Sequence, residues 1–260
     1  MSQEGAALAR ATFTTQAASY AASAVVADRE RRRQFVAHVA PAPDARVLDV
    51  ATGPGFTALA FAERAGFVLG LDLTPAMLVQ ARQARDAAGA MGLQFVLGEA
   101  TALPVASGAF DVVGCGNAVH HFAAPLPPLR EFARACRPGG QIAISDLTTD
   151  EDPQRAAEHN AIERLRDPSH VCSYPPSELA ALLTSLGLVV RSVETTTRRR
   201  GLAEWLAIAK TPPERAAAVR ERLLASLDDD RTGLAPAWED GQLCFTHTTA
   251  WLIAAKPESA

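Results

Sequence analysis

The stretch Arg46-Val47-Leu48-Asp49-Val50-Ala51-Thr52-Gly53-Pro54-Gly55 decides the fold of this 260-residue chain. Its first five residues form a short, mostly apolar run, which is typical of a strand buried on both faces of a parallel sheet. Gly53 and Gly55 follow as a turn, because glycine lets the backbone bend sharply and lets a ligand approach it closely. A helix behind such a turn points its positive end at that ligand. The stretch therefore predicts a strand, a ligand-binding loop and a helix in succession.

The alternation of strand and helix continues on both sides of this stretch. Further apolar strands are predicted at 67–72, 93–97, 110–115, 141–146, 188–196 and 242–255. Repeated alternation implies βαβ units, and hence a parallel sheet with helices on both faces. We therefore expect an α/β fold, namely a Rossmann-like, doubly wound sheet of seven mostly parallel strands.

The chain divides into an N-terminal helical part and a larger domain. Residues 1–40 are expected to form a helical lid, with one helix over 2–40. Residues 41–260 are expected to form the Rossmann-like domain. Two segments, 148–175 and 197–241, break the rhythm around the last strands, where a small cover over the substrate would lie.

Composition and charge argue against several classes of protein. The net charge is −4, whereas a duplex-binding protein usually carries a basic surface. The one basic run, Arg198-Arg199-Arg200, is interpreted as a solvated strand end. No stretch approaches the roughly 20 apolar residues that span a bilayer, and the first 30 residues lack a secretory pattern. We expect a cytoplasmic protein with a small-molecule substrate and neither a nucleic-acid nor a membrane partner.

The four cysteines, Cys115, Cys136, Cys172 and Cys244, form no CxxC pair. Neither a zinc site nor a disulfide framework is indicated, and no metal site is predicted. The sequence leaves open whether the chain is a monomer or a homodimer.

An acidic residue after the second strand indicates the type of ligand. Asp72 can accept hydrogen bonds from both ribose hydroxyls of an adenosine. A Gly-x-Gly-x-x-Ala turn with such an acid also fits a nicotinamide dinucleotide, so an NAD(P)-dependent oxidoreductase stays an alternative. Asp49 would face the anionic pyrophosphate of a dinucleotide unfavourably, but its charge suits a ligand with an ammonium and a sulfonium group. Neither Tyr20 nor Tyr174 is followed by lysine four residues on, so a Tyr-x-x-x-Lys pair is absent.

Several ordered motifs carry a resemblance to a known family. They are the opening stretch, Gly70-Leu71-Asp72-Leu73-Thr74-Pro75-Ala76-Met77-Leu78, Gly98-Glu99-Ala100-Thr101-Ala102-Leu103-Pro104, Phe110-Asp111-Val112-Val113 and residues 129–140. Together they resemble class I S-adenosylmethionine-dependent methyltransferases, in the branch of ubiquinone/menaquinone C-methyltransferases and small-molecule, natural-product methyltransferases. One departure is Glu99, because the family usually carries Asp at this position.

The resemblance implies S-adenosylmethionine as the cofactor and a set of residues that contact it. By resemblance, this set is Gly53, Gly55, Asp72, Leu73, Met77, Glu99, Ala100 and Asn117. Asp49 joins the set through its charge, and Tyr20 through the N-terminal segment that folds over the cofactor in relatives. Phe13 shares a helical face with Tyr20 and is a candidate for substrate contact. Ordinary helix packing would also explain both aromatic residues.

Histidines after the fourth strand are candidates for catalysis. His120 and His121 follow that strand, and Asp146 ends the fifth, so their side chains should meet at the carboxyl edge of the sheet. A histidine oriented by a carboxylate is a good general base near neutral pH. Some methyltransferases of this family use such a pair here, and we expect His121 to pair with Asp146, with His120 as second choice. The alternative is that the histidines only pack under the cover.

The segment after the fifth strand supplies candidates for substrate binding. His170 and Tyr174 lie in this insertion and could face the acceptor, although a plain loop explains them too. The expected function is methyl transfer to an O, N or C atom of a small organic molecule, in secondary metabolism. Two alternatives remain: a cofactor-binding relative that catalyses a cyclisation or another non-methylating reaction, and a non-catalytic regulatory protein.

Overall fold

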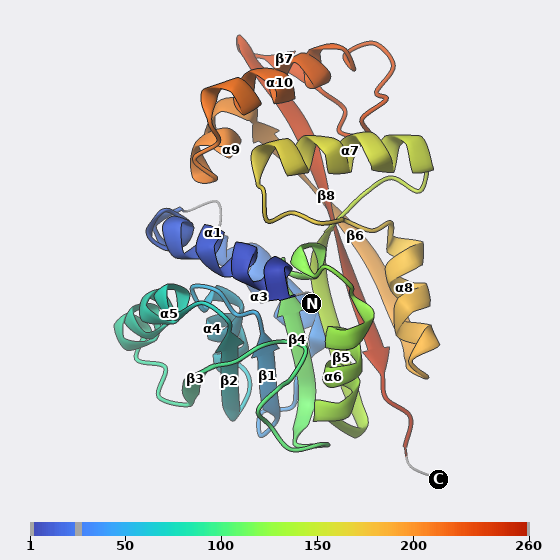
Figure 1. Ribbon diagram of the computed structural model, residues 1–260. Coiled ribbons are helices and arrows are strands. Elements are labelled where there is room, and N and C mark those ends of the chain that lie inside the picture. The colour runs from blue at the N-terminus through green and yellow to red at the C-terminus, as the bar shows by residue number, and fades with distance from the viewer. Residues whose placement is uncertain (1–2, 24–27, 259–260) are drawn as a thin grey trace.

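The computed structural model describes residues 3–23 and 28–258 of the chain. Its centre is a sheet with the strand order β3-β2-β1-β4-β5-β8-β6, and the short β7 pairs with β8 (Figure 1). The strands are β1 (Arg46–Val50), β2 (Phe67–Asp72), β3 (Leu93–Leu97), β4 (Phe110–Gly116), β5 (Cys136–Thr148), β6 (Val189–Gly201), β7 (Ala237–Glu239) and β8 (Gln242–Ala255). Strands β1 to β5 are parallel, and β8 runs antiparallel to β5 and β6. The expected Rossmann-like fold is therefore confirmed, with β7 as an addition.

Helices cover both faces of this sheet. They are α1 (Gln3–Ala22), α3 (Arg29–Val39), α4 (Phe56–Ala62), α5 (Pro75–Ala88), α6 (Leu126–Ala135), α7 (Pro153–Arg166), α8 (Pro176–Ser185), α9 (Leu202–Ile208), α10 (Pro213–Leu224) and the 3-10 turn η1 (Val119–His121). One apolar core contains residues of α6 and α8, and a second contains residues of α3 and α4. Val47, Leu48 and Val50 of β1 are fully buried between them. The continuous apolar run of β1 follows from this burial, because both faces of the strand are covered.

The single helix expected over 2–40 is wrong. The helix α1 ends at Ala22 and α3 begins at Arg29, and residues 24–27 lie outside the described residues. The carboxylate of Asp28 accepts a hydrogen bond from the backbone N–H of Arg31 at 3.2 Å. Such an N-cap satisfies a free donor of the helix, so Asp28 begins a new helix.

A second, smaller layer lies beyond the carboxyl ends of the parallel strands. It consists of α7, α9, α10 and β7, which gather around the far half of β8 (Figure 1). Its core includes Trp205 of α9, Leu223 of α10 and Phe245 of β8. The two segments expected as insertions around the last strands thus contain the helices α7, α9 and α10. We call this layer, residues 149–175 and 202–241 with the adjoining half of β8, the cover.

Among the described residues, no helix combines the length and the apolar character that crossing a membrane requires.

Candidate active site

A cavity of about 300 Å³ lies between the carboxyl edge of the sheet, helix α1 and the cover. The loops after β1, β2, β3 and β4 form its floor, and α1, α7 and α9 contribute to its walls. Ligands of open α/β sheets bind at this edge, where the strand order reverses between β1 and β4. The topology therefore brings distant segments of the chain to one site.

The loop after β1 leaves open space above its backbone. Gly53 adopts φ +54°, and a Cβ built on it would meet no atom within 4 Å. The Asp72 carboxylate at the end of β2 holds this loop, since its Oδ2 accepts the N–H of Gly53 at 2.8 Å. Its Oδ1 accepts the N–H of Thr74 at 2.8 Å. Each oxygen keeps a further lone pair for a ligand hydroxyl, so the geometry suits a ribose.

Gly55 and Asp49 lie behind this loop and do not line the cavity. Gly55 has φ +82°, and a Cβ there would come within 3.0 Å of Phe95. Glycine is therefore required at this position for backbone conformation and packing. Asp49 is fully buried, and its Oδ2 accepts the hydroxyl of Thr52 at 2.6 Å. Thr52 itself lines the cavity, so Asp49 would act on a ligand through it.

The electrostatic state of Asp49 fits a positively charged ligand. Burial raises the pKa of this carboxyl to about 7, although the hydrogen bond from Thr52 and the charge of Arg32 oppose the shift. Its Oδ1 is buried without a hydrogen-bond partner among the described residues. A cationic group bound above the loop would compensate this carboxylate, and would suit it better than a phosphate.

The remaining predicted cofactor residues line the cavity along the ends of β2, β3 and β4. Asn117 has φ +54°, and its N–H donates to the carbonyl oxygen of Ser145 at 2.7 Å. Glu99 accepts the hydroxyl of Thr101 at 2.7 Å, which orients its carboxylate. The other members of this group are Leu73, Met77 and Ala100. Their contacts with a cofactor stay predictions.

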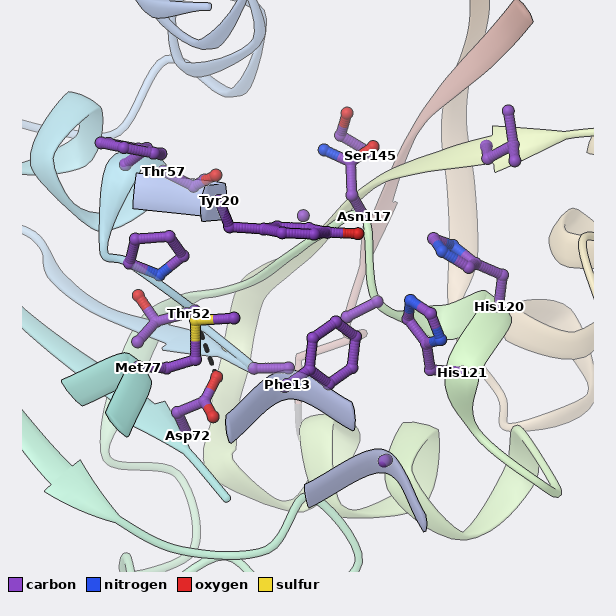
Figure 2. A pocket seen from close by; sticks show the side chains of 18 of the residues that line it. Phe13, Tyr20, Thr52, Thr57, Asp72, Met77, Asn117, His120, His121 and Ser145 are labelled. Atoms are coloured by element: carbon purple, nitrogen blue, oxygen red, sulfur yellow. Dashed lines mark hydrogen bonds between the residues drawn. The ribbon is translucent and has the colours of Figure 1, made fainter. Parts of the chain in front are cut away.

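Two aromatic side chains of α1 reach into the cavity. Figure 2 shows Phe13 and Tyr20 between Asp72 on one side and the two histidines on the other. The ring of Phe13 meets that of His121 edge-on at a centroid distance of 4.9 Å. Burial raises the pKa of the Tyr20 hydroxyl, while the nearby Arg166 of α7 opposes this shift. Helix α1 thus contacts both the sheet edge and the cover, and its role as a lid stays a prediction.

The expected pairing of His121 with Asp146 is wrong, because His120 takes that place. Nδ1 of His120 lies 2.5 Å from Oδ1 of Asp146, and the backbone N–H of His120 donates to Oδ2 at 3.0 Å. Both histidines belong to the 3-10 turn η1, where successive side chains point about 120° apart. Only one of them can therefore face the end of β5.

His121 has different partners. Its Nδ1 lies 3.0 Å from the carbonyl oxygen of Ser169 and 3.2 Å from the Ser169 hydroxyl. Burial and the neighbouring His120 lower the pKa of His121 to about 4. Burial also lowers the pKa of His120, but the charge of Asp146 and the hydrogen bond with it outweigh burial, so that pKa is raised. The cavity thus contains a neutral histidine beside a more basic one.

Comparison with known proteins agrees with this geometry. A family model described as a methyltransferase domain matches residues 48–144. The protein named as uncharacterized methyltransferase YcgJ of Bacillus subtilis is 29% identical over 219 residues, which are 84% of this chain and 87% of YcgJ. YafE of Escherichia coli is 31% identical over 159 residues, 61% of this chain and 77% of YafE. This chain belongs to the class I S-adenosylmethionine-dependent methyltransferases.

Two further similarities, one of structure and one of sequence, support the assignment to this family. The crystal structure of YcgJ superimposes with a TM-score of 0.83 and 27% identity, covering 88% of this chain and all of YcgJ. The ubiquinone/menaquinone biosynthesis C-methyltransferase UbiE of Roseobacter denitrificans is 37% identical over 113 residues, 42% of this chain and 45% of UbiE. The protein is thus an enzyme, and its cofactor is S-adenosylmethionine.

Two residues predicted to bind the substrate of this methyltransferase lie outside the cavity wall. His170 is buried, and its Nε2 lies 2.8 Å from Oδ1 of Asn160. Its ring packs behind His120 at a centroid distance of 5.4 Å. The carbonyl oxygen of Tyr174 accepts the hydroxyl of Thr148 at 2.6 Å, which ties this segment to the end of β5. His170 thus supports the histidine turn from behind, whereas Tyr174 joins its segment to the sheet.

Strand β6 and the cover contribute cavity residues that the sequence did not predict. The basic run at 198–200 is not simply a solvated strand end, because side chains alternate along β6. Arg198 and Arg200 line the cavity, whereas Arg199 points away and pairs with Glu239 at 2.7 Å. Glu163 of α7 and His247 of β8 also line it. In the sequence, the alternation of side chains along β6 was the feature that could have indicated that Arg198 and Arg200 share one face and Arg199 the other.

Proposed function

We propose that this methyltransferase transfers the methyl group to a hydroxyl oxygen of a small organic acceptor that also carries an acidic group. The observation that carries the proposal is the His120–Asp146 pair on the cavity wall. Oxygen acceptors need a proton removed during transfer, and a histidine oriented by a carboxylate performs this step. We assign the reaction to secondary metabolism, on the resemblance to natural-product methyltransferases.

The cavity residues divide the work between cofactor and acceptor. Asp72 would hold the ribose and Glu99 the adenine, while the buried charge of Asp49 would favour the cationic end of the cofactor. The bound cofactor supplies a methyl group that its sulfonium already activates. The protein therefore has to align the acceptor oxygen, exclude water and accept one proton.

His120 is placed to accept that proton. Its Nδ1 donates to Asp146 in the neutral tautomer that this pairing selects, which leaves Nε2 as the acceptor. His121 is held by Ser169 and contacts Phe13, so it shapes the apolar wall beside the base. We propose His120 as the general base, with Asp146 as the residue that positions it.

The acidic group of the acceptor is inferred from Arg200. This arginine lines the cavity, and its Nε is buried without a hydrogen-bond partner among the described residues. Burial lowers its pKa to about 10, and Arg166 and Arg198 reinforce the shift. A carboxylate or similar anion on the acceptor would neutralise this charge and satisfy the unpaired donor.

The proposal is tested with methyl-labelled S-adenosylmethionine and a panel of hydroxylated acceptors, each compared with its amine, its carbon-acid and its carboxylate-free analogue. Label should enter the hydroxy acids preferentially, and His120→Ala should slow turnover by about 100-fold or more.

Arg200→Ala should raise KM for the acidic acceptors alone. Arg199→Ala, which changes the neighbouring arginine that points outward, should leave KM and kcat unchanged. Preferential labelling of amines or carbon acids would overturn the proposal. Consumption of an acceptor without label transfer would instead favour a cyclisation.

A further inference from the structure

A second cluster of polar side chains lies where the cover meets the long strand β8. His159 and Glu163 are four residues apart on α7 and so share one face of the helix. His247 of β8 approaches them from the opposite side. The exposed fractions of the three side chains are 2%, 3% and 10%. All three are thus withdrawn from water.

The distances within this cluster suit a shared ligand. Oε1 of Glu163 lies 2.9 Å from Nε2 of His247 and 3.6 Å from Nε2 of His159. All three atoms lie within 4.8 Å of one another. Ligand atoms at about 2.0–2.2 Å from a tetrahedral ion are separated by roughly 3.4 Å. The separation of 3.6 Å is close to this value and that of 2.9 Å is shorter, so a small rotation of the His247 ring would bring both into the range of a shared ion.

Glu163 lies within ion-pair distance of both imidazoles, but neither contact has the direction of a well-formed hydrogen bond. Oε1 of Glu163 and both Nε2 atoms are buried and lack a hydrogen-bond partner among the described residues. The 2.9 Å contact is short enough for a hydrogen bond, but its direction is not suitable for one. Buried polar atoms without partners require an explanation, and a bound ion is one. Three buried atoms of this kind within 4.8 Å of one another are a donor set that a shared ligand would satisfy.

Neighbouring side chains hold the three residues of the cluster in place. Arg166 lies 3.9 Å from Oε2 of Glu163, which leaves Oε1 to the imidazoles. The ring of His247 is packed edge-on by Phe245 and Trp205, at 4.8 Å and 5.4 Å between centroids. The rings of His159 and His247 stack at 5.8 Å with 10° between their planes. Packing therefore keeps both rings next to Glu163, so that only a small rotation is needed to complete the site.

We propose that His159, Glu163 and His247 bind one divalent transition-metal ion of the Zn²⁺ type. Two imidazoles and one carboxylate are a common ligand set for such ions, and this set leaves at least one coordination position open. Glu163 and His247 line the cavity, so the open position faces the acceptor. An acceptor oxygen would complete the coordination there, and this second role rests on the proposed function.

The test uses the full-length protein, stripped with a chelator and titrated with Zn²⁺ in calorimetry and in competition with a chromophoric chelator. One ion should bind per chain. Glu163→Gln and His247→Ala should each weaken binding by at least about 100-fold, since even outer-shell changes cost roughly 10–100-fold. His38→Ala is the matched control, because His38 contacts Ser192 and Glu194 outside the cluster. Failure of the wild-type protein to bind stoichiometrically, or equal binding by the variants, would overturn the site.

Cobalt substitution keeps the proposal testable if the variants do not fold. The wild-type protein loaded with Co²⁺ should show the intense visible absorption of a four- or five-coordinate ion with nitrogen ligands. A spectrum of hydrated Co²⁺ alone would refute the metal site.

Methyl transfer is measured separately. If the metal binds but no hydroxyl group is methylated, only the proposed function is refuted. Hydroxyl methylation that survives metal removal unchanged refutes the role in acceptor binding.

Discussion

His120 and His121 are neighbours in the chain, but their surroundings give them opposite proton affinities. Asp146 raises the pKa of His120 against the effect of burial. His121 has no carboxylate at hydrogen-bond distance among the described residues, and burial lowers its pKa to about 4. The environment of each ring, and not its position in the sequence, therefore decides which of the two is more basic.

This difference predicts the pH dependence of methyl transfer. The base must be neutral, so kcat should fall as the pH decreases through the raised pKa of His120, above the ordinary value of about 6.5. In Asp146→Asn the charge that raises this pKa is gone, so burial dominates and the acidic limb should move to lower pH. The measurement is kcat against pH for both proteins. An acidic limb at the same pH in both would contradict the assignment of His120.

Asp72 carries a second prediction. Asp72→Asn keeps the size of the side chain but loses the charge-assisted hydrogen bonds, which contribute roughly 1.5–3 kcal/mol. Affinity for S-adenosylmethionine should therefore fall by about 10-fold or more in a calorimetric titration. Asp86→Asn, on the exposed face of α5, serves as the control. Equal affinity in the two variants would mean that the ribose lies elsewhere.

At the scale of single residues, local motifs predicted the cofactor side better than the acceptor side. Asp72 ends β2, and Gly53 and Glu99 lie in the loops after β1 and β3, so their positions follow from the strand order. Arg200 and Glu163 reach the cavity only because distant elements fold over it. The alternation along β6 indicates that Arg198 and Arg200 share a face, but it does not say what that face meets, so their place in the cavity emerged only from the structure.

At the scale of elements, α1 is the helix with the most unusual position. It lies beyond the carboxyl edge of the sheet, beside α5 and near α9 (Figure 1). Ala9, Phe13 and Tyr20 line the cavity from it. Much of its inner face thus meets the ligand space instead of a packed core, so the ligand should contribute to its stability.

Hydrogen exchange tests this position. Saturating S-adenosylhomocysteine should slow amide exchange in α1 and in the loop after β1, because the ligand fills the space beneath the helix. Exchange in α8, which packs on β6 away from the cavity, should stay unchanged and serves as the internal control. Slowing in α8 to the same degree as in α1 would indicate general stabilisation without a local contact.

The elements that sequence reasoning located correctly are those with strong local patterns. Strands β1, β2, β3 and β8 have the expected bounds. The strand β6 extends to Gly201, beyond the expected end at 196, because it pairs with β8 as far as Cys244. Helix α9 was missed, since seven residues give too short a periodicity to recognise. Tertiary pairing, and not local propensity, sets these bounds.

At the scale of the whole molecule, one cavity joins the sheet, α1 and the cover. A ligand that binds only the folded state raises stability by about 2.7 kcal/mol at 100 times its Kd. For a chain of this size, that corresponds to a rise in Tm of about 5–10 °C. Thermal unfolding with S-adenosylmethionine should show this rise, whereas NAD at the same concentration should not. A comparable shift with NAD would contradict the choice of cofactor.

The strand β8 has a consequence for the protein during its synthesis. It lies between β5 and β6 and is made about 100 residues after β5. At roughly 5–20 residues per second, a ribosome needs about 5–20 seconds to cover that distance. Throughout this interval the nascent chain carries β5, with its apolar residues Ile142, Ala143 and Ile144, as an open edge. Unpaired edges invite pairing with other chains, so we expect the growing polypeptide to be most prone to aggregation until β8 is made.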